Sequence, residues 1–214
     1  MKYQLAIFDL DGTLLNTLED LADSVNHIMR QFGYPERSLS EVRSFVGNGI
    51  RKLIERSAPE DTPAEEIDRM FERFKEYYGA HCADKTRPYD GIMELLDTLQ
   101  KQGIKLAVVS NKADYAVKAL CEQYFPGIFD EAVGERMGIA RKPAPDTVNE
   151  VLKNLQIDKS LAVYIGDSEV DVQTARNAEM DCIAVDWGFR DTSVLKEAGA
   201  ETIVSTPKDL MKSL

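Results

Sequence analysis

Short apolar runs that alternate with amphipathic helical patterns are the feature that most constrains the fold of this chain. They begin near Arg87 and continue almost to the end of the 214 residues. Buried strands that alternate with helices are typical of a parallel sheet built from strand–helix–strand units. The sequence therefore predicts an α/β fold with a Rossmann-like parallel sheet, with strands at residues 105–110, near 131–134, at 161–166, and near 182–185 and 202–204.

One further strand is predicted at the other end of the chain. Residues 5–8 form an apolar run that ends at a turn signal, and from there to Arg87 the sequence shows only helical patterns and loops. We therefore expect an α/β catalytic core made of residues 1–15 and 87–214, with an all-helical cap domain, residues 16–86, inserted after the first strand. Ligands of such sheets bind at the carboxyl ends of the strands, so the cap would cover the site as a lid.

The composition limits the partners that the protein can have. A formal net charge of −11 disfavours nucleic acid and anionic membranes as partners. The three cysteines lie far apart, which indicates neither a disulfide framework nor a thiolate zinc site. No apolar run has the length of a signal-peptide core or a membrane span. We therefore expect a cytoplasmic monomer or homodimer that binds neither nucleic acid nor membranes.

Two carboxylates follow the first predicted strand directly. Asp9 and Asp11 are two positions apart, so in an extended segment their side chains would face the same side. Like charges at that distance repel and raise one pKa, which indicates either a shared proton or a divalent metal ion. Taken alone, Asp11-Gly12 is equally consistent with a simple turn after the strand.

Polar residues also follow the later strands. Because the carboxyl ends of parallel strands meet at one edge of a sheet, these residues are expected to lie together. Each of them also fits a structural role when taken singly, as a solvated lysine, a helix cap or a surface acid. They are Ser110, Asn111 and Lys112 after the second strand, Lys142 in a proline-rich loop, and Asp167, Ser168 and Asp171 after residues 161–166.

The acidic members of this set suit a magnesium ion. Mg²⁺ prefers hard oxygen ligands and keeps several waters, so Asp9, Asp167 and a backbone carbonyl near Asp11 would suffice to hold it. Asp171 lies four residues after Asp167, which places both carboxylates on one face of a helix that opens there. We therefore expect Mg²⁺ at this edge of the sheet.

The other members suit a phosphoryl group. Lys142 supplies positive charge, and Ser110 supplies a hydroxyl donor. Backbone amides near Gly12 and Asn111, together with the hydroxyl and amide of Thr13, add further donors. Four strand ends that each offer what phosphoryl transfer needs predict a phosphotransferase site.

The chain carries four motifs in order, Asp9-x-Asp11-Gly12-Thr13, Ser110-Asn111, Lys142-Pro143 and Gly166-Asp167-Ser168-x-x-Asp171. They resemble the four ordered motifs of the haloacid dehalogenase superfamily of phosphotransferases, and the resemblance spans the whole chain. The second carboxylate indicates the phosphatase branch, and the insert resembles the helical, C1-type cap of that family. The segments 186–190 and 198–200 are similar to the C-terminal part of its phosphoglycolate phosphatase group.

The resemblance implies a role for each of the residues in these motifs. Asp9 would be the nucleophile that becomes an aspartyl phosphate, and Asp11 the general acid and then the base. Lys142 and Ser110 would stabilise the charge on the phosphoryl oxygens. Asp171 would orient Lys142 or a metal-bound water.

A loop in the predicted cap is our candidate for substrate selection. Gly47, Asn48 and Gly49 interrupt the helical pattern and free backbone amides at a helix start, and Arg51 adds a positive charge one turn later. The alternative is a simple helix break. We expect a small anionic substrate, with phosphoglycolate first and pyrophosphate or a sugar phosphate next.

Three function classes remain open from the sequence. The first is a Mg²⁺-dependent phosphatase of small phosphorylated metabolites, the second is a phosphomutase similar to β-phosphoglucomutase, and the third is a binding protein without catalytic activity. The intact set of Asp9, Asp11, Lys142 and Asp167 argues against the third class.

Overall fold

The computed structural model describes residues 2–214, which divide into two compact units. One unit contains the chain up to Leu15 together with Pro88–Leu214, and the other is Asn16–Arg87. Among the described residues, no helix is long and apolar enough to cross a membrane.

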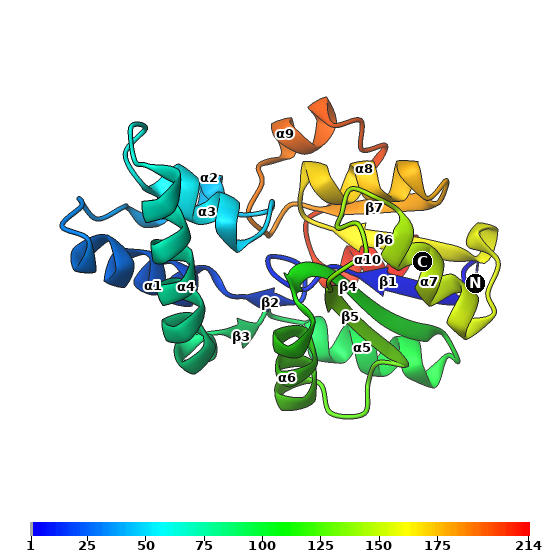
Figure 1. Ribbon diagram of the computed structural model, residues 1–214. Helices are drawn as coiled ribbons and strands as arrows, with labels where there is room; N and C mark the ends of the chain where they lie inside the picture. The colour runs from blue at the N-terminus through cyan, green and yellow to red at the C-terminus, as the bar shows by residue number, and fades with distance from the viewer. Residues whose placement is uncertain (1) are drawn as a thin grey trace. The chain divides into compact units, whose positions relative to one another are not determined.

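A six-stranded sheet forms the centre of the larger unit (Figure 1). Its strand order is β5-β4-β1-β6-β7-β8, and every neighbouring pair is parallel. The predicted α/β fold with a parallel sheet is therefore confirmed. The strands are β1 (Leu5–Phe8), β4 (Lys105–Ala113), β5 (Glu131–Glu135), β6 (Ala162–Gly166), β7 (Asp181–Val185) and β8 (Thr202–Val204).

The first strand lies in the middle of this sheet. Leu5 pairs with Lys105 of β4 on one side and with Ala162 of β6 on the other. All four residues of β1 are fully buried, as expected for a parallel strand whose two faces are both covered by helices. Whatever follows Phe8 is therefore placed between the ends of β4 and β6.

Helices connect the strands of this unit. On one face of the sheet, Val148 and Val151 of α7 pack with Ile7, Val109 and Tyr164 of three neighbouring strands. The helices are α5 (Ile92–Lys101), α6 (Asp114–Tyr124), α7 (Asp146–Leu155), α8 (Glu169–Asn177), α9 (Thr192–Glu197) and α10 (Pro207–Ser213), with a short 3₁₀ helix at Lys159–Leu161.

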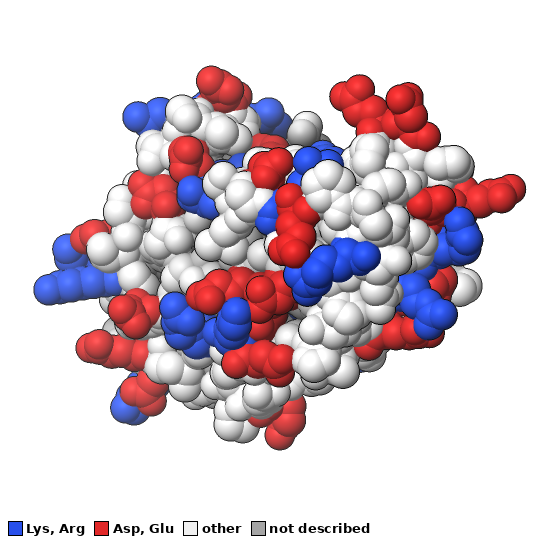
Figure 2. Space-filling model, turned by 90° about the vertical axis from the view of Figure 1, so that its left-hand side faces the viewer, with Lys and Arg blue, Asp and Glu red and all other residues white. Residues whose placement is uncertain are grey.

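The smaller unit is helical and has an apolar core of its own. Val25, Val42, Ile54 and Phe74 are completely buried there, one from each helix. Its surface carries acidic and basic side chains in ion pairs such as Lys52 with Glu55, and Figure 2 shows both charges interspersed over one face of the molecule. The helices are α1 (Leu18–Gln31), α2 (Leu39–Phe45), α3 (Ile50–Ser57) and α4 (Ala64–His81).

Two features of the chain near the ends of the helical unit were not expected from the sequence. The short strands β2 (Leu15–Asn16) and β3 (Arg87–Pro88) form a separate two-stranded sheet. The buried carboxylate of Asp20 accepts hydrogen bonds from the backbone N–H groups of Lys85 at 2.9 Å and Thr86 at 2.8 Å. This side chain therefore ties the last residues of the unit to its first helix.

Candidate active site

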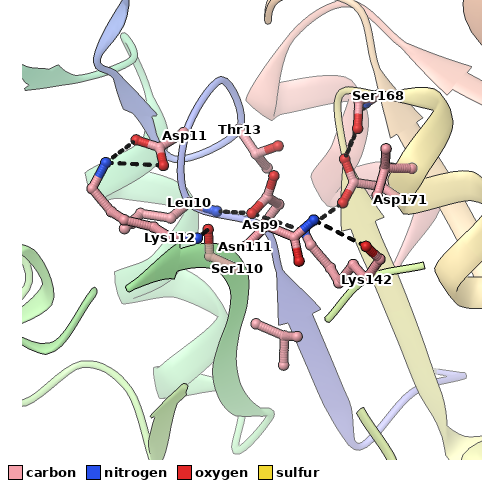
Figure 3. Close-up of polar contacts among 12 residues, drawn as sticks. Asp9, Leu10, Asp11, Thr13, Ser110, Asn111, Lys112, Lys142, Ser168 and Asp171 are labelled. Carbon is pink, nitrogen blue, oxygen red and sulfur yellow. Dashed lines mark hydrogen bonds and ion pairs between the residues drawn. The ribbon is translucent and has the colours of Figure 1, made fainter. Parts of the chain in front are cut away.

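Asp9 is the first residue after β1, and its surroundings fix the carboxylate. Its Oδ1 accepts a hydrogen bond from the N–H of Leu10 at 2.7 Å and lies 3.0 Å from Nζ of Lys142 (Figure 3). The residue is only 8% exposed. Burial raises the pKa of Asp9 to about 7, with Lys142 opposing this shift and Asp171 and Asp11 adding to it.

Lys142 lies at the centre of the site, and each donor of its ammonium group has an acceptor. Nζ contacts Oδ1 of Asp171 at 2.7 Å, Oδ1 of Asp9 at 3.0 Å and the hydroxyl of Tyr164 at 3.0 Å. The Tyr164 hydroxyl donates to the carbonyl of Val109 at 3.0 Å, so its oxygen is free to accept from Lys142. Burial lowers the pKa of Lys142, but Asp171 and Asp9 outweigh that effect and hold it well above its usual value.

Asp171 is completely buried and holds the start of α8. Its Oδ2 accepts from the hydroxyl of Ser168 at 2.6 Å and from the N–H of Ser168 at 3.1 Å. Because Ser168 is the N-cap and the helix begins at Glu169, Asp167 lies before the helix. The expectation that Asp167 and Asp171 lie on one face of the same helix is therefore wrong. Both carboxylates nevertheless reach the site.

Asp167 is 1% exposed and is oriented from two sides. Its Oδ1 accepts from the hydroxyl of Thr13 at 3.0 Å, and its Oδ2 accepts from the N–H of Phe189 at 2.7 Å. A Cβ atom at Gly12 or at Gly188 would collide with this carboxylate. Gly12 also has φ +89°, so the turn after β1 needs glycine for its conformation and for the close approach.

Asp9, Asp167 and Asp171 form one acidic cluster. One carboxylate oxygen from each lies within 4.8 Å of the other two. Burial, followed by the charges of Asp171 and Asp9, raises the pKa of Asp167 well above its usual value. Lys142 brings an ammonium group to this cluster, through its contacts with Asp9 and Asp171. A divalent cation fits such a site, since it would compensate the remaining charge with hard oxygen ligands.

The structure differs from the sequence interpretation at Asp11. The strand ends at Phe8, so the two-residue alternation that would point Asp9 and Asp11 the same way does not extend to Asp11. Its carboxylate instead accepts from Nζ of Lys112 at 2.9 and 3.1 Å, and it is not a member of the acidic cluster (Figure 3). In this structure Asp11 is therefore not placed as a side-chain metal ligand.

The predicted phosphate donors also have contacts within the protein. The Thr13 hydroxyl donates to Asp167, and the Ser110 hydroxyl accepts from the N–H of Lys112 at 3.3 Å. Nδ2 of Asn111 donates to the carbonyl of Lys142 at 3.1 Å. Asn111 thus supports the loop that carries Lys142, a contact that sequence reasoning did not anticipate. Substrate binding by these three residues stays a prediction.

The predicted cap residues make their contacts inside the helical unit. Asn48 accepts through Oδ1 from Arg56 at 2.7 Å, and Arg51 pairs with Asp68 and, at 3.3 Å, with Glu55. The helix α3 begins at Ile50, directly after the glycine pair at Gly47 and Gly49, as the interruption of the pattern predicted. Recognition of a substrate by this loop stays a prediction.

Sequence reasoning missed two residues of the site. Tyr164 lies in an apolar strand, and its sequence neighbours do not indicate that its hydroxyl contacts another buried side chain. Lys112 was recognised only as part of the Ser110-Asn111-Lys112 strand end, with no role. In the structure β4 runs to Ala113, beyond the predicted end at residue 110, and this extension carries Lys112 to the site edge.

Curated relatives are similar to this chain over most of its length. A phosphoglycolate phosphatase from Caulobacter vibrioides is 36% identical over 212 residues, covering 96% of this chain and 88% of that protein. A phosphoglycolate phosphatase from Agrobacterium fabrum is 34% identical over 90% of this chain and 84% of that protein.

Solved structures are similar over the same length. A candidate phosphoglycolate phosphatase from Lactobacillus delbrueckii subsp. bulgaricus is 43% identical with a TM-score of 0.95, covering 100% of this chain and 98% of that one. The CbbY protein from Rhodobacter sphaeroides, solved in complex with phosphate, is 26% identical with a TM-score of 0.73, covering 97% and 96%. A family model described as haloacid dehalogenase-like hydrolase matches residues 6–185, and the chain belongs to this family.

Proposed function

We propose that this hydrolase is a Mg²⁺-dependent phosphatase of small phosphorylated metabolites that acts through an aspartyl phosphate, with phosphoglycolate as its substrate. The observation that carries the proposal is the position of Asp9. It follows the central strand, is nearly buried, and is held at Oδ1 by Leu10 and Lys142 beside two further carboxylates. A carboxylate so placed is suited to act as a nucleophile.

Asp9 and Asp11 divide the covalent chemistry between them in this proposal. Leu10 and Lys142 both bind Oδ1 of Asp9, so we assign the attack on phosphorus to Oδ2. Asp11 first takes up a proton from solvent as it leaves Lys112, and the bond from phosphorus to the leaving oxygen breaks as Asp11 gives that proton to the oxygen. Asp11 then takes a proton from a water that attacks the aspartyl phosphate, which releases phosphate and restores Asp9.

Buried groups around Asp9 hold Lys142 and Asp167 in position for this reaction. Lys142 brings a positive charge to the phosphoryl oxygens, and Asp171 and Tyr164 keep its Nζ in place. Asp9 and Asp167 would hold Mg²⁺, together with a backbone carbonyl near Asp11. The ion would supply charge neutralisation for the transferring phosphoryl group. Thr13 and Phe189 orient Asp167 for that task.

The relatives support the choice of substrate. Both curated relatives described above are named phosphoglycolate phosphatases. A second candidate is a sugar phosphate, because CbbY from Rhodobacter sphaeroides has also been solved in complex with xylulose-(1,5)bisphosphate. In either case the cap loop with Gly47, Asn48, Gly49 and Arg51 would recognise the part of the substrate away from the phosphorus.

A phosphate-release screen tests the proposal. The purified protein is incubated with Mg²⁺ and with phosphoglycolate, pyrophosphate, sugar monophosphates and a sugar bisphosphate, and Asp9→Asn serves as the inactive control. We expect phosphoglycolate to be the best substrate and chelation of the metal to abolish release. A preference for the sugar bisphosphate would favour the second candidate, whereas isomerisation of a sugar phosphate without release would indicate a phosphomutase. No turnover of any substrate would overturn the proposal.

A further inference from the structure

Lys112 and Asp11 form a second ion pair at the site, apart from the pairs of Lys142. Nζ of Lys112 donates to both carboxylate oxygens of Asp11, at 2.9 and 3.1 Å (Figure 3). The side chains are only 4% and 15% exposed. Pairs on the surface contribute little because water screens them, but a pair this buried is costly to break since it leaves an uncompensated charge.

The backbone of Lys112 contacts its own strand and the neighbouring strand. Lys112 lies within β4, and its N–H donates to the hydroxyl of Ser110. A Cβ atom at Gly134 of the neighbouring strand would collide with the carbonyl of Lys112, which shows how closely the two backbones approach. The N–H of Gly134 is in turn bound by Asp114 at 3.0 Å.

The two lysines divide the carboxylates of the site between them. Lys142 contacts Asp9 and Asp171, whereas Lys112 contacts Asp11. The cluster around Lys142 already contains three carboxylates, two of which contact its ammonium group. Without Lys112, the nearest positive charges for the Asp11 carboxylate would be Lys142 and the cation. If Asp11 moved toward either of them, it would no longer be placed to protonate the leaving oxygen.

We propose that Lys112 is a positioning residue that keeps Asp11 at the edge of the site and out of the acidic cluster. The inference rests on the proposed function, in which Asp11 handles the protons of both steps. Asp11 leaves Lys112 only when the leaving oxygen or the attacking water offers it a new partner. Lys112 thus fixes the position of the Asp11 side chain before the reaction, and it does not itself contact the substrate.

Kinetics of three variants test this role. Lys112→Met keeps the aliphatic stem and removes the charge, and we expect kcat to fall by about tenfold or more with KM changed by less than about twofold. Lys112→Arg restores a cation and should recover most of kcat. Lys101→Met, which removes the lysine of an exposed pair with Asp97, is the matched control and should leave both constants unchanged.

A double-mutant cycle separates positioning from substrate binding. In an Asp11→Asn background, measured by single turnover with excess enzyme, Lys112→Met should change the rate by less than about twofold, because its effect passes through Asp11. The double variant has lost both charges and is therefore expected to fold. An equal loss in both backgrounds, or a raised KM or inhibition constant for inorganic phosphate in Lys112→Met, would overturn the inference.

A structure of the Lys112→Met protein gives a readout that does not depend on activity. We expect the Asp11 carboxylate to have turned toward Lys142, and an unchanged Asp11 position would contradict the inference. The proposed function fails if the natural protein releases no phosphate. The role of Lys112 fails separately, if the natural protein is active and Lys112→Met matches it.

Discussion

Lys142 and Asp171 form a buried ion pair at the site, with Nζ and Oδ1 2.7 Å apart and both side chains almost fully covered. Asp171 also binds the N–H and hydroxyl of Ser168 through its other oxygen. One carboxylate therefore links the start of α8 to the lysine beside Asp9. Changes at Asp171 are expected to affect both stability and turnover.

Asp171→Asn should lower both properties. An asparagine side chain is uncharged and has only one oxygen that can accept. It therefore cannot replace both carboxylate oxygens of Asp171, and either Lys142 or Ser168 is left with a buried donor that lacks its acceptor. We expect a loss of about 1–3 kcal/mol in unfolding free energy and a fall in kcat of at least about tenfold. Thermal denaturation and phosphate release measure the two effects. Asp97→Asn, in an exposed pair with Lys101, is the control, and equal behaviour of the two variants would refute the prediction.

Tyr164→Phe isolates one of the three acceptors of Lys142. The change keeps the ring and removes only the hydroxyl, so Nζ of Lys142 keeps Asp9 and Asp171 but gains freedom to move. We expect kcat to fall by about tenfold with a stability loss of about 1–3 kcal/mol. Ser57→Ala removes another buried hydroxyl, which donates to Leu53 at 2.7 Å in the helical unit. It should lower stability without lowering kcat; a normal kcat in Tyr164→Phe would show that the hydroxyl does not position Lys142.

Residues at the strand ends were the most predictable part of this molecule. In a parallel sheet the carboxyl ends of neighbouring strands meet, so a sequence that shows strands and their ends also shows which residues become neighbours. Asp9 and Asp167 directly follow β1 and β6 and lie together as that rule requires, and Lys142 reaches Asp9 from the loop that follows β5. The rule concerns backbone position, which apolar periodicity reveals well.

Side-chain partners were much less predictable. The contact of Lys112 with Asp11 depends on β4 extending to Ala113, where it pairs with Glu135 of β5 after a shift in register. Tyr164 is one residue of an apolar strand, and nothing in its sequence neighbours distinguishes a core ring from one whose hydroxyl binds a lysine. Such contacts are set by strand register and by packing between distant segments, which one sequence does not specify.

Removal of the metal should make stability depend on pH through Asp9. Its pKa is about 7 in the folded protein, chiefly because of burial, against an ordinary value of 3.8. Between about pH 4 and about pH 7 the folded state therefore binds more protons than the unfolded state, so rising pH lowers the free energy of unfolding. Asp9→Asn has no carboxyl group at this position, so its free energy of unfolding does not fall with pH for this reason. In a chelator, its Tm should exceed that of the natural protein increasingly from about pH 4 to about pH 7, by about 2–4 °C for each kcal/mol.

Two measurements check this prediction. Thermal unfolding across that pH range gives the difference in Tm between Asp9→Asn and the natural protein, and excess Mg²⁺ should reduce the difference because a bound cation stabilises the ionised cluster. A Tm difference that stays constant with pH in the chelator would show that Asp9 does not hold a proton in the folded apoprotein.

Asp20→Ala should destabilise the helical unit. The substitution leaves the N–H groups of Lys85 and Thr86 without the buried carboxylate that now accepts from them, which costs about 1–3 kcal/mol. Asp23→Ala is a close control, because Asp23 pairs with the side chain of the same Lys85 on the exposed surface at 2.6 Å. That pair is worth at most about 1 kcal/mol. Equal losses in thermal or denaturant unfolding would contradict a special role for Asp20.

The cap loop should influence the choice of substrate more than the chemistry. Asn48 and Arg51 would contact the anionic group of phosphoglycolate that lies away from phosphorus, and an aryl phosphate has no such group. Asn48→Ala and Arg51→Ala should therefore lower kcat/KM for phosphoglycolate by about tenfold and leave the aryl phosphate within about twofold. Equal effects on both substrates would exclude the loop as a recognition element.

The ion pair between Arg51 and Asp68 sharpens this last test. In the structure Arg51 is engaged by Asp68 and Glu55 within the helical unit, so a substrate anion has to compete with them for the guanidinium. Asp68→Ala removes the competitor and keeps Arg51. If Arg51 recognises the substrate, Asp68→Ala should lower KM for phosphoglycolate and have no effect on the aryl phosphate, the opposite of the change expected for Arg51→Ala. A rise in KM for phosphoglycolate in Asp68→Ala would instead indicate that the pair only shapes the loop.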